Sequence, residues 1–488
     1  MQYRVLSIAV TFGLVAALLP CTAAANGQST HLWITADAIS HVPPGPLADF
    51  LADPALDRML RNGTMFPDGG YPLGDPYAEI AHWEPFQTRY LEWILANHQP
   101  PFTDEGAQHL AFWLGMASHG MADQSFDALY GERVKVYDGD FGDFDTASDL
   151  IMMSYFEPMM APSDWVPYAV FDQLYDQVGY DVDPATMMDG QNLLRIAVNS
   201  VAIFSQMPDQ VAESAAPFPW GSQHLLDETV PGAPPCEGEI VARYWRVLWA
   251  VAHGQPLPGP VLATIPADGA ANHAIDSSSI ESWISVVSSR GLEHAPLDVS
   301  SFHVVSEGGT EVPLAIWHYY GQDAHIVHLQ PQADLEADTI YTVTMDPGVQ
   351  TIHGEALDGY VFRFSTGAVG PDPIVPEWPE DHDPNPEPGD GDGDGDDDGE
   401  SGDGDGESGD GDGEPGDGDG ESGDGDATDE SGTGGGDPKA DEAGGCSCSS
   451  ALAPRYAPAL LFPILVGLSS SVRRRRSHAV ADRSARAR

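Results

Sequence analysis

Cysteine is scarce in this sequence, which limits how the protein can be stabilised. Only four of the 488 residues are cysteines. Cys21 lies near the amino terminus, Cys236 stands alone in the middle of the chain, and Cys446 and Cys448 lie near the carboxyl terminus. No disulfide framework is therefore expected in the folded part, and its stability must come largely from apolar cores.

Basic residues are also few. The chain has 20 lysines and arginines against 76 aspartates and glutamates, a formal net charge of −56. Residues 371–445 alone contain 29 acidic side chains and one lysine, Lys439, and so carry about half of this charge. Such an excess repels nucleic acid and, at a distance, anionic membrane surfaces. Nucleic acid is therefore not favoured as a partner.

Long apolar runs are lacking too. The stretches at residues 5–19 and 457–468 are both shorter than the ~20 residues of a permanent transmembrane helix. The first follows Arg4 and precedes three alanines, so residues 1–25 are predicted to be a secretory signal peptide and the protein to be exported. The second lies between a Cys-Ser-Cys motif and four arginines. This order favours a sorting tail over residues 446–488, with a permanent membrane anchor as the alternative.

Between these ends, the sequence predicts several domains. Apolar residues at three- and four-residue intervals predict a mainly α-helical domain over residues 26–255. Residues 260–368 are rich in β-formers and predict a β-sandwich, and the Gly/Asp/Glu-rich residues 369–445 predict a disordered acidic linker. Helices are expected at 47–60, 78–96, 103–130, 147–156, 166–178, 184–207 and 237–252, and strands at 282–288, 302–306, 312–317, 324–329, 339–345 and 360–366.

Four residues of metal-ligand type occur in the first quarter of the chain: Asp68, His82, His119 and Asp123. Two imidazoles and two carboxylates suit a zinc ion with a position open for water, and bound water then ionises near neutral pH. Because residues four apart share a helix face, His119 and Asp123 can reach one ion. Taken singly, each motif has an ordinary explanation: an ion pair on a helix, a histidine at a core edge, or a turn.

The order of these motifs resembles the zinc-dependent phospholipase C/D family, especially its glycosylphosphatidylinositol-specific phospholipase D branch. The resemblance spans residues 31–156 and rests on Phe66-Pro67-Asp68, His82-Trp83-x-Pro85-Phe86, and Leu114-Gly115-x-x-Ser118-His119-x-x-Ala122-Asp123, with Ser29-Thr30-His31 upstream. It implies that Asp68, His82, His119 and Asp123 bind one zinc. It also implies that His31 binds another zinc, with Asp123 as a bridge, and that Asp68 orients the attacking water. His41 is a second candidate for the role of His31.

The sequence departs from the family at a further metal position. Where the family has histidines, this chain has Asp127 and Asp145, and Asp149 completes the spacing. An all-carboxylate site favours magnesium, manganese or calcium over zinc. The alternatives are a degenerate site or a solvated acidic loop.

Two other segments resemble known families. Residues of the β-rich part, such as Ile265-Pro266-Ala267-Asp268-Gly269 and the final Phe362-Arg363-Phe364-Ser365-Thr366-Gly367, resemble bacterial immunoglobulin-like domains of surface-layer proteins. The carboxyl terminus resembles the MYXO-CTERM sorting tail. This implies a sorting protease as partner, a modification at Cys446 or Cys448, and membrane attachment through the tail.

Together these features predict a secreted, surface-anchored, metal-dependent phosphodiesterase that hydrolyses phospholipid or glycolipid headgroups. Two alternatives stay open. One is a single-strand nuclease or another phosphoesterase with the same metal architecture. The other is a non-catalytic adhesion or structural protein with a degenerate metal site. The β-sandwich is expected to be a spacer or an adhesive module.

Overall fold

A computed structural model describes residues 26–374, except 140, 141, 143, 294–296, 298, 299 and 319–322. The predicted signal peptide, almost all of the acidic linker, and the tail with Cys446 and Cys448 lie outside the described residues. The described helices and strands belong to one compact unit, Met1–Gly395. Within the described residues, no helix is both long and apolar enough to cross a membrane.

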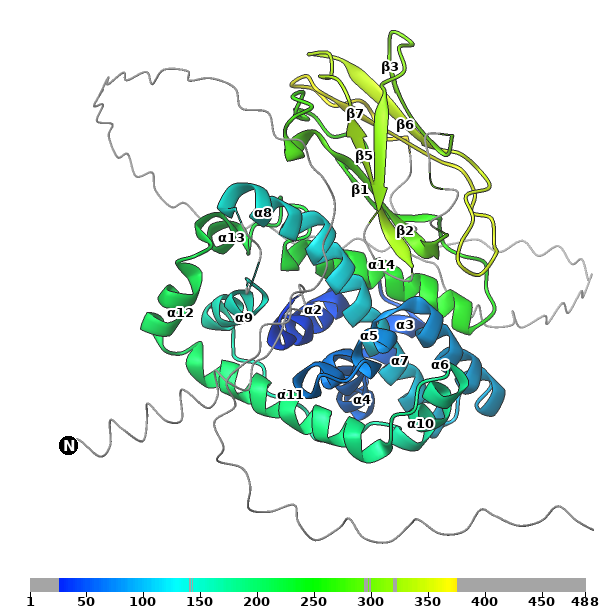
Figure 1. Ribbon diagram of the computed structural model, residues 1–488. Coiled ribbons are helices and arrows are strands. Elements are labelled where there is room, and N and C mark those ends of the chain that lie inside the picture. Colours follow the sequence, from blue (N-terminus) through cyan, green and yellow to red (C-terminus); the bar gives the residue numbers. More distant parts are fainter. Residues whose placement is uncertain are drawn as a thin grey trace, which may run out of the picture. The chain divides into compact units, whose positions relative to one another are not determined.

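The first part of the described chain, which we call the head, is helical (Figure 1). Its elements are α2 (Gln28–Ser40), α3 (Pro46–Leu51), α4 (Pro54–Met65), the 3₁₀ helix η1 (Pro67–Leu73), α5 (Tyr77–His82), α6 (Glu84–Asn97), α7 (Asp104–Ser125), the π-helix η2 (Phe126–Gly131), α8 (Glu132–Asp138), α9 (Phe144–Tyr155), α10 (Tyr168–Gln177), α11 (Pro184–Phe204), α12 (Pro208–Ala215), α13 (Pro219–His224) and α14 (Pro234–Ala252).

A break at Trp83 separates α5 from α6. The sequence pattern predicts one helix over residues 78–96, and this prediction is wrong. Trp83 has extended backbone angles, φ −99° and ψ 145°. Pro85, which follows within the first turn of α6, lacks the N–H that a continuous helix needs but is tolerated at a helix start. The chain therefore restarts at Glu84, and His82 becomes the last residue of α5.

Helix α2 lies in the middle of the head and has α4, α7, α9, α11 and α14 as neighbours (Figure 1). The sequence pattern does not predict this helix. Eight of its 13 residues are buried, and they include polar as well as apolar side chains. A helix that is surrounded by others has no single apolar stripe, and the stripe is the feature that reveals a helix in a sequence.

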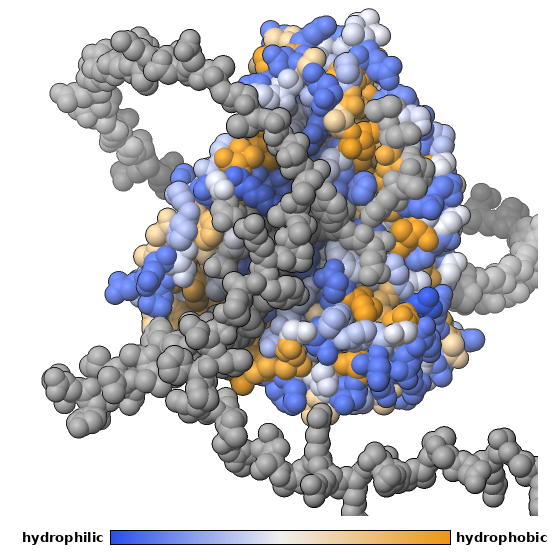
Figure 2. Space-filling model, in the orientation of Figure 1, coloured by the Kyte–Doolittle hydropathy of each residue, from blue (hydrophilic) through white to orange (hydrophobic). Residues whose placement is uncertain are grey.

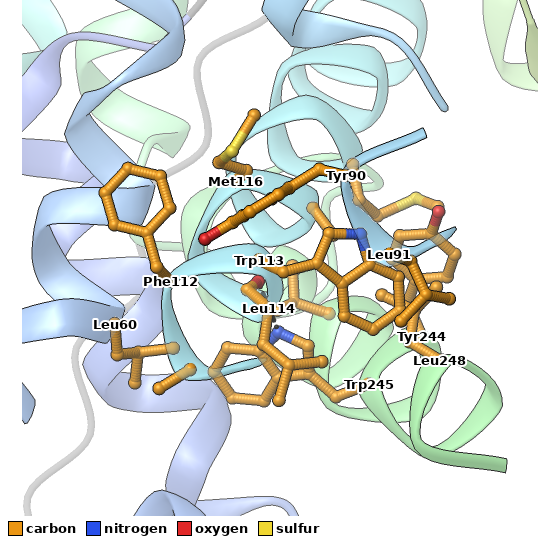
Figure 3. Close-up of a cluster of buried hydrophobic side chains, with 14 of the residues drawn as sticks. Leu60, Tyr90, Leu91, Phe112, Trp113, Leu114, Met116, Tyr244, Trp245 and Leu248 are labelled. Carbon is orange, nitrogen blue, oxygen red and sulfur yellow. Dashed lines mark hydrogen bonds between the residues drawn. The ribbon is translucent and has the colours of Figure 1, made fainter. Parts of the chain in front are cut away.

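The core of the head surrounds α7 (Figure 3). Trp113 and Trp245 are buried, and each donates its indole N–H to a backbone carbonyl: Trp113 to Gln87 O at 2.9 Å and Trp245 to Leu114 O at 2.9 Å. Buried aromatic groups with satisfied N–H groups fix the helices around α7 rigidly. A rigid α7 matters because it carries two of the predicted metal ligands.

The second part, which we call the sandwich, contains two antiparallel sheets. One sheet has the strand order β1-β2-β5-β4 and the other β3-β6-β7. The structure confirms the predicted fold class of a helical region followed by a β-sandwich, with one strand, β1, beyond the six that were expected. The strands are β1 (Val261–Ile265), β2 (Ile284–Leu292), β3 (Phe302–Ser306), β4 (Leu314–His318), β5 (Ala324–Pro331), β6 (Ile340–Met345) and β7 (Tyr360–Ser365).

The surface is mixed in character. On the face shown in Figure 2, hydrophobic residues form separate patches among hydrophilic ones. Several large apolar side chains of the head are exposed, among them Tyr155 and Phe156 at the end of α9 and Ile196 and Ile203 on α11. Single exposed apolar residues are normal on a protein surface, so they assign no function by themselves.

Candidate metal centre

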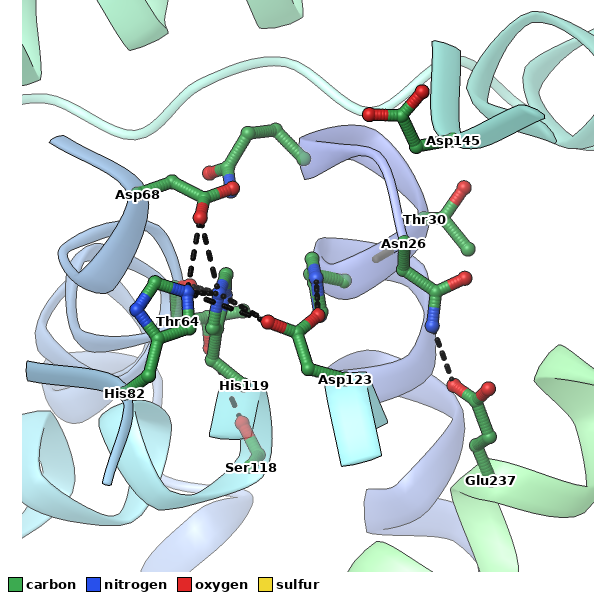
Figure 4. A network of polar contacts seen from close by, with 12 residues as sticks. Asn26, Thr30, Thr64, Asp68, His82, Ser118, His119, Asp123, Asp145 and Glu237 are labelled. Carbon is green, nitrogen blue, oxygen red and sulfur yellow. Dashed lines mark hydrogen bonds and ion pairs between the residues drawn. The ribbon is translucent and has the colours of Figure 1, made fainter. Parts of the chain in front are cut away.

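Four side chains converge inside the head (Figure 4). Asp68 comes from η1, His82 from the end of α5, and His119 and Asp123 from α7. The two histidine Nε2 atoms lie 3.0 Å apart. Asp68 Oδ1 lies 3.1 Å from His82 Nε2 and 3.5 Å from His119 Nε2. Asp123 Oδ2 lies 3.3 Å from each of these nitrogens.

These distances fit a cation shared by Asp68, His82 and His119, while Asp123 falls with His31 and His119 in a second group of three. Ligand atoms that surround a zinc ion at about 2.0–2.1 Å lie about 3.3–3.4 Å from one another. The histidine tautomers fit as well, because His82 Nδ1 lies 2.7 Å from Ala78 O and His119 Nδ1 lies 2.7 Å from Thr64 O. Each Nδ1–H donates to its carbonyl, so in the neutral rings both Nε2 lone pairs point to the shared centre.

The electrostatics of the centre favour positive charge. Burial alone would lower the pKa of His119, but the carboxylates of Asp123 and Asp68 outweigh it and raise that pKa to about 9. The pKa of His82 is also raised against the effect of burial, by the same carboxylates. Burial opposes ionisation of Asp68 and Asp123, yet His119 keeps both carboxyl pKa values below the usual range. A bound cation would take the place of these protons.

His31 adjoins the same cluster. Its Nε2 lies 2.8 Å from Asp123 Oδ1, and its ring stacks on His119 with the centroids 3.8 Å apart. His31 Nε2 thus pairs with Asp123, whereas Nδ1 has no hydrogen-bond partner within the described residues. An imidazole nitrogen and a carboxylate oxygen this close suit a shared cation as well as an ion pair. His31, His119 and Asp123 offer ligand atoms within 4.8 Å of one another, as do Asp68, His82 and His119.

Several residues that position the candidate ligands belong to no motif in the sequence. The Gln28 amide donates to Asp68 Oδ2, and the Gln87 amide donates to His82 O at 2.8 Å. Gly120 lets α7 approach the end of α5, because a Cβ at this position would overlap His82 O. This close approach sets the distance between the two facing histidines. In the sequence, the one hint of this close approach is the glycine, Gly120, directly after the candidate ligand His119.

Asp149 serves the helix that carries His31. One of its oxygens accepts from Ser29 N–H at 3.1 Å, and the other accepts from Thr30 N–H at 2.7 Å and from the Thr30 hydroxyl at 2.8 Å. These N–H groups belong to the first turn of α2, whose N-cap residue, Gly27, has no side chain to supply an acceptor. Burial raises the pKa of Asp149 to about 6.

Asp127 and Asp145 lie on other elements. Asp127 is buried on η2. Asp145 is half-buried at the start of α9, where its Oδ1 accepts from Thr146 N–H at 2.6 Å, and Figure 4 shows it apart from the His–Asp cluster. Among the described residues, no compact group of three ligand-type side chains contains Asp127, Asp145 or Asp149. The hard-cation site therefore stays a prediction.

Of two further candidate groups, Glu237 lies near the centre and His41 does not. Glu237 on α14 is fully buried and accepts from the Asn26 amide at 2.8 Å. Burial raises the pKa of Glu237 well above the usual range, and the nearby Asp123 and Asp127 add to this effect. His41, by contrast, is exposed and pairs with Asp37 at 3.2 Å, so the structure places His31, not His41, at the cluster.

Comparison with known proteins gives one family match and two short similarities. The profile of the Bacterial Ig-like domain family matches residues 258–366. The phosphatidylinositol-glycan-specific phospholipase D of Dictyostelium discoideum is 35% identical over 71 residues, which are 14% of this chain and 8% of that protein. The Rattus norvegicus enzyme of the same name is 33% identical over 73 residues, 14% of this chain and 9% of that protein. The chain thus matches less than a tenth of either relative.

Solved structures add nothing to this assignment. The S-layer protein SbsC is 12% identical, with 66% of this chain and 46% of that chain covered, but the TM-score is 0.19. Such a score supports no argument about fold or location. The chain therefore contains a bacterial Ig-like domain and a helical head with buried His–Asp clusters that could hold metal, and it shares a short segment with phosphatidylinositol-glycan-specific phospholipase D.

Proposed function

We propose that the chain is an exported, metal-dependent phosphodiesterase that hydrolyses the headgroup of a phospholipid or glycolipid. The observation that supports this most is the pair of facing imidazole nitrogens, 3.0 Å apart, with a carboxylate oxygen of Asp68 and one of Asp123 each within 3.1–3.5 Å of both nitrogens. The short similarity to a phospholipase D supports the choice of a phosphodiester and of a lipid. Zinc suits this mixed nitrogen and oxygen set best.

Each residue of the centre has a proposed task. When bound, zinc polarises a phosphoryl oxygen and lowers the pKa of a coordinated water. Asp68, His82, His119 and Asp123 hold the first ion, and His31 with the second oxygen of Asp123 holds another. We also assign Asp68 the orientation of the attacking water, through the Oδ2 that accepts from the Gln28 amide.

The experiment uses the zinc-loaded full chain with phospholipid vesicles and, separately, with single-stranded DNA. We expect release of a phosphorylated headgroup, or formation of phosphatidic acid, at a higher rate than DNA cleavage. Asp68→Asn should lower the lipid rate by about 100-fold or more, since general-base contributions are of this size. Asp209→Asn is the matched control, because Asp209 is an exposed acid on α12.

Two outcomes would favour the alternatives. Faster cleavage of DNA would support a single-strand nuclease, a reading that the net charge of −56 disfavours. Turnover of neither substrate, with metal still bound, would support a structural or adhesive protein. The structural or adhesive alternative is kept because the set of Asp127, Asp145 and Asp149 departs from the family at its further metal position.

The proposal includes display at the cell surface. It rests on the signal-like amino terminus, the Ig-like domain and the tail of residues 446–488. If a sorting protease removes the tail and Cys446 or Cys448 is modified, mass spectrometry of the surface-extracted protein should find no peptide from residues 477–488. Recovery of those peptides would instead support a permanent anchor.

A further inference from the structure

A buried carboxylate of the head is surrounded by groups of the sandwich. Glu84, the first residue of α6, is 3% exposed. Its Oε1 lies 3.1 Å from Arg290 Nη2 and 2.9 Å from His353 Nε2. Its Oε2 accepts from Gly291 N–H at 2.6 Å and lies 3.2 Å from His325 Nε2. All four partners belong to the sandwich, so both oxygens of this head residue are satisfied by the other part of the unit.

A second contact joins the same two parts. The Gln124 amide on α7 donates to Asp323 Oδ1 at 3.0 Å, and its carbonyl accepts from His325 N–H at 3.1 Å. Asp323 Oδ2 in turn accepts from the backbone N–H of Glu84 at 2.7 Å. Asp323 and His325, at the start of β5, are 1% and 2% exposed. One carboxylate of the sandwich thus binds both α6 and α7.

These two head residues adjoin the metal ligands in the sequence. Glu84 follows His82 by two residues, across the break at Trp83, and Gln124 directly follows Asp123. We propose that the sandwich positions the metal centre, with Asp323 acting through Glu84 and Gln124 to hold the ligand-bearing ends of α5 and α7 in register. This inference rests on the proposed metal centre. It replaces the expectation that the sandwich is only a spacer or an adhesive module.

The charges at the contact favour positioning over a second metal site. Glu84, Asp323 and His325 offer ligand atoms within 4.8 Å of one another. However, Arg290 already pairs with Glu84, and a fixed guanidinium leaves little room or need for another cation. Buried charge pairs of this kind are costly to form but strict in geometry, which suits a positioning role.

The test measures metal binding by the full chain without any substrate. Asp323→Ala removes the acceptor that both α6 and α7 use, on a residue that belongs to the sandwich and not to the centre. We expect zinc affinity, measured by competition with a chelator, to fall about 10–100-fold, as is usual when outer groups that orient ligands are lost. The visible spectrum of the cobalt-loaded chain should change as well. Asp323→Asn keeps one acceptor oxygen. It should therefore lower the zinc affinity less and change the cobalt spectrum less.

The matched control is Glu281→Gln. Glu281 is a sandwich residue that binds Arg133 of the head at 3.2 Å, but Arg133 lies on α8, away from the ligands. Loss of the Glu281 carboxylate should leave the zinc affinity and the cobalt spectrum unchanged. Gln124→Ala serves as the second variant if Asp323→Ala does not fold.

The result decides between the two proposals. If the wild-type chain binds zinc and the Asp323 and Gln124 variants bind it equally well, with the same cobalt spectrum, the positioning role is refuted and the metal centre stands. If the wild-type chain binds no zinc, the metal centre itself is wrong, and the positioning role falls with it.

Discussion

The two facing histidines depend on single backbone carbonyls for their orientation. Ala78 O holds His82 and Thr64 O holds His119, each through Nδ1 at 2.7 Å. These carbonyls lie in α5 and α4, so the centre needs the packing of α4, α5 and α7 as much as its ligands. Outer contacts of this type fix the tautomer of a ligating imidazole.

Gly120 gives a direct test of this dependence. In Gly120→Ala, the new Cβ would overlap His82 O, so α5 and α7 must separate. We expect zinc affinity to fall about 10-fold or more and stability to fall by about 1–3 kcal/mol, the usual cost of overpacking. Chelator competition and urea unfolding measure the two effects. Gly308→Ala, where a Cβ makes only an ordinary contact with Ser306 Oγ at 3.7 Å, should change neither, and an equally mild Gly120→Ala would contradict this dependence on packing.

The sequence predicted which residues of metal-ligand type lie close together better than it predicted the residues that support them. Asp68, His82, His119 and Asp123 belong to spaced motifs, and the structure brings them together within 3.0–3.5 Å. Gln28, Gln87 and Glu237 carry no motif, because their roles depend on contacts with residues far away in the sequence. Such contacts are set by tertiary packing, which local patterns do not contain.

Among the elements, α2 shows most clearly where sequence patterns fail. It carries His31 into the centre, yet its buried residues go all round the helix and its N-cap residue is a glycine. Amphipathic helices such as α10, which buries Phe171, Leu174 and Tyr175 on one face, were predicted within a few residues of their bounds. Six of the seven described strands were also predicted, since alternation of β-formers is a local signal, but β1 was not.

The capping of α2 by Asp149 predicts a loss of stability that does not need metal. Asp149→Ala would leave Ser29 N–H, Thr30 N–H and the Thr30 hydroxyl without this acceptor. We expect the metal-free chain, in excess chelator, to lose about 1–2 kcal/mol in urea unfolding, and Asp149→Asn to lose less. Asp189→Ala, at an exposed acid within α11, is the control.

The opposite pattern would point to a metal role. If Asp149→Ala were as stable as the wild type in chelator, and lost stability relative to it when magnesium or manganese was supplied, Asp149 would be a ligand of the hard-cation site. The capping role would then be contradicted.

Buried acidic residues join the head to the sandwich, so the stability of the whole molecule should depend on pH. Burial raises the pKa of Asp323 from 3.8 to about 6, while His325 opposes the shift. The folded state therefore holds the proton more tightly than the unfolded state. The resulting stabilisation is complete below pH 3.8 and is lost as the pH rises through about 6.

Asp323→Asn removes this titration. The unfolding free energy of the wild type, minus that of Asp323→Asn, should fall by about 3 kcal/mol from about pH 4 to about pH 7. Urea unfolding of the metal-free full chain at several pH values measures it. A difference that stays constant, or that grows with pH, would show that Asp323 is not held in a desolvated joint.

Elemental analysis of the purified full chain will show whether the head binds metal through the His–Asp cluster. After dialysis against zinc and removal of free ion, we expect at least one zinc per chain. His119→Ala should lose zinc, because His119 is fully buried and belongs to both candidate groups. His41→Ala, at an exposed histidine outside the cluster, should retain it. A wild-type chain without zinc, or a His119→Ala chain with an undiminished zinc content, would contradict the assignment.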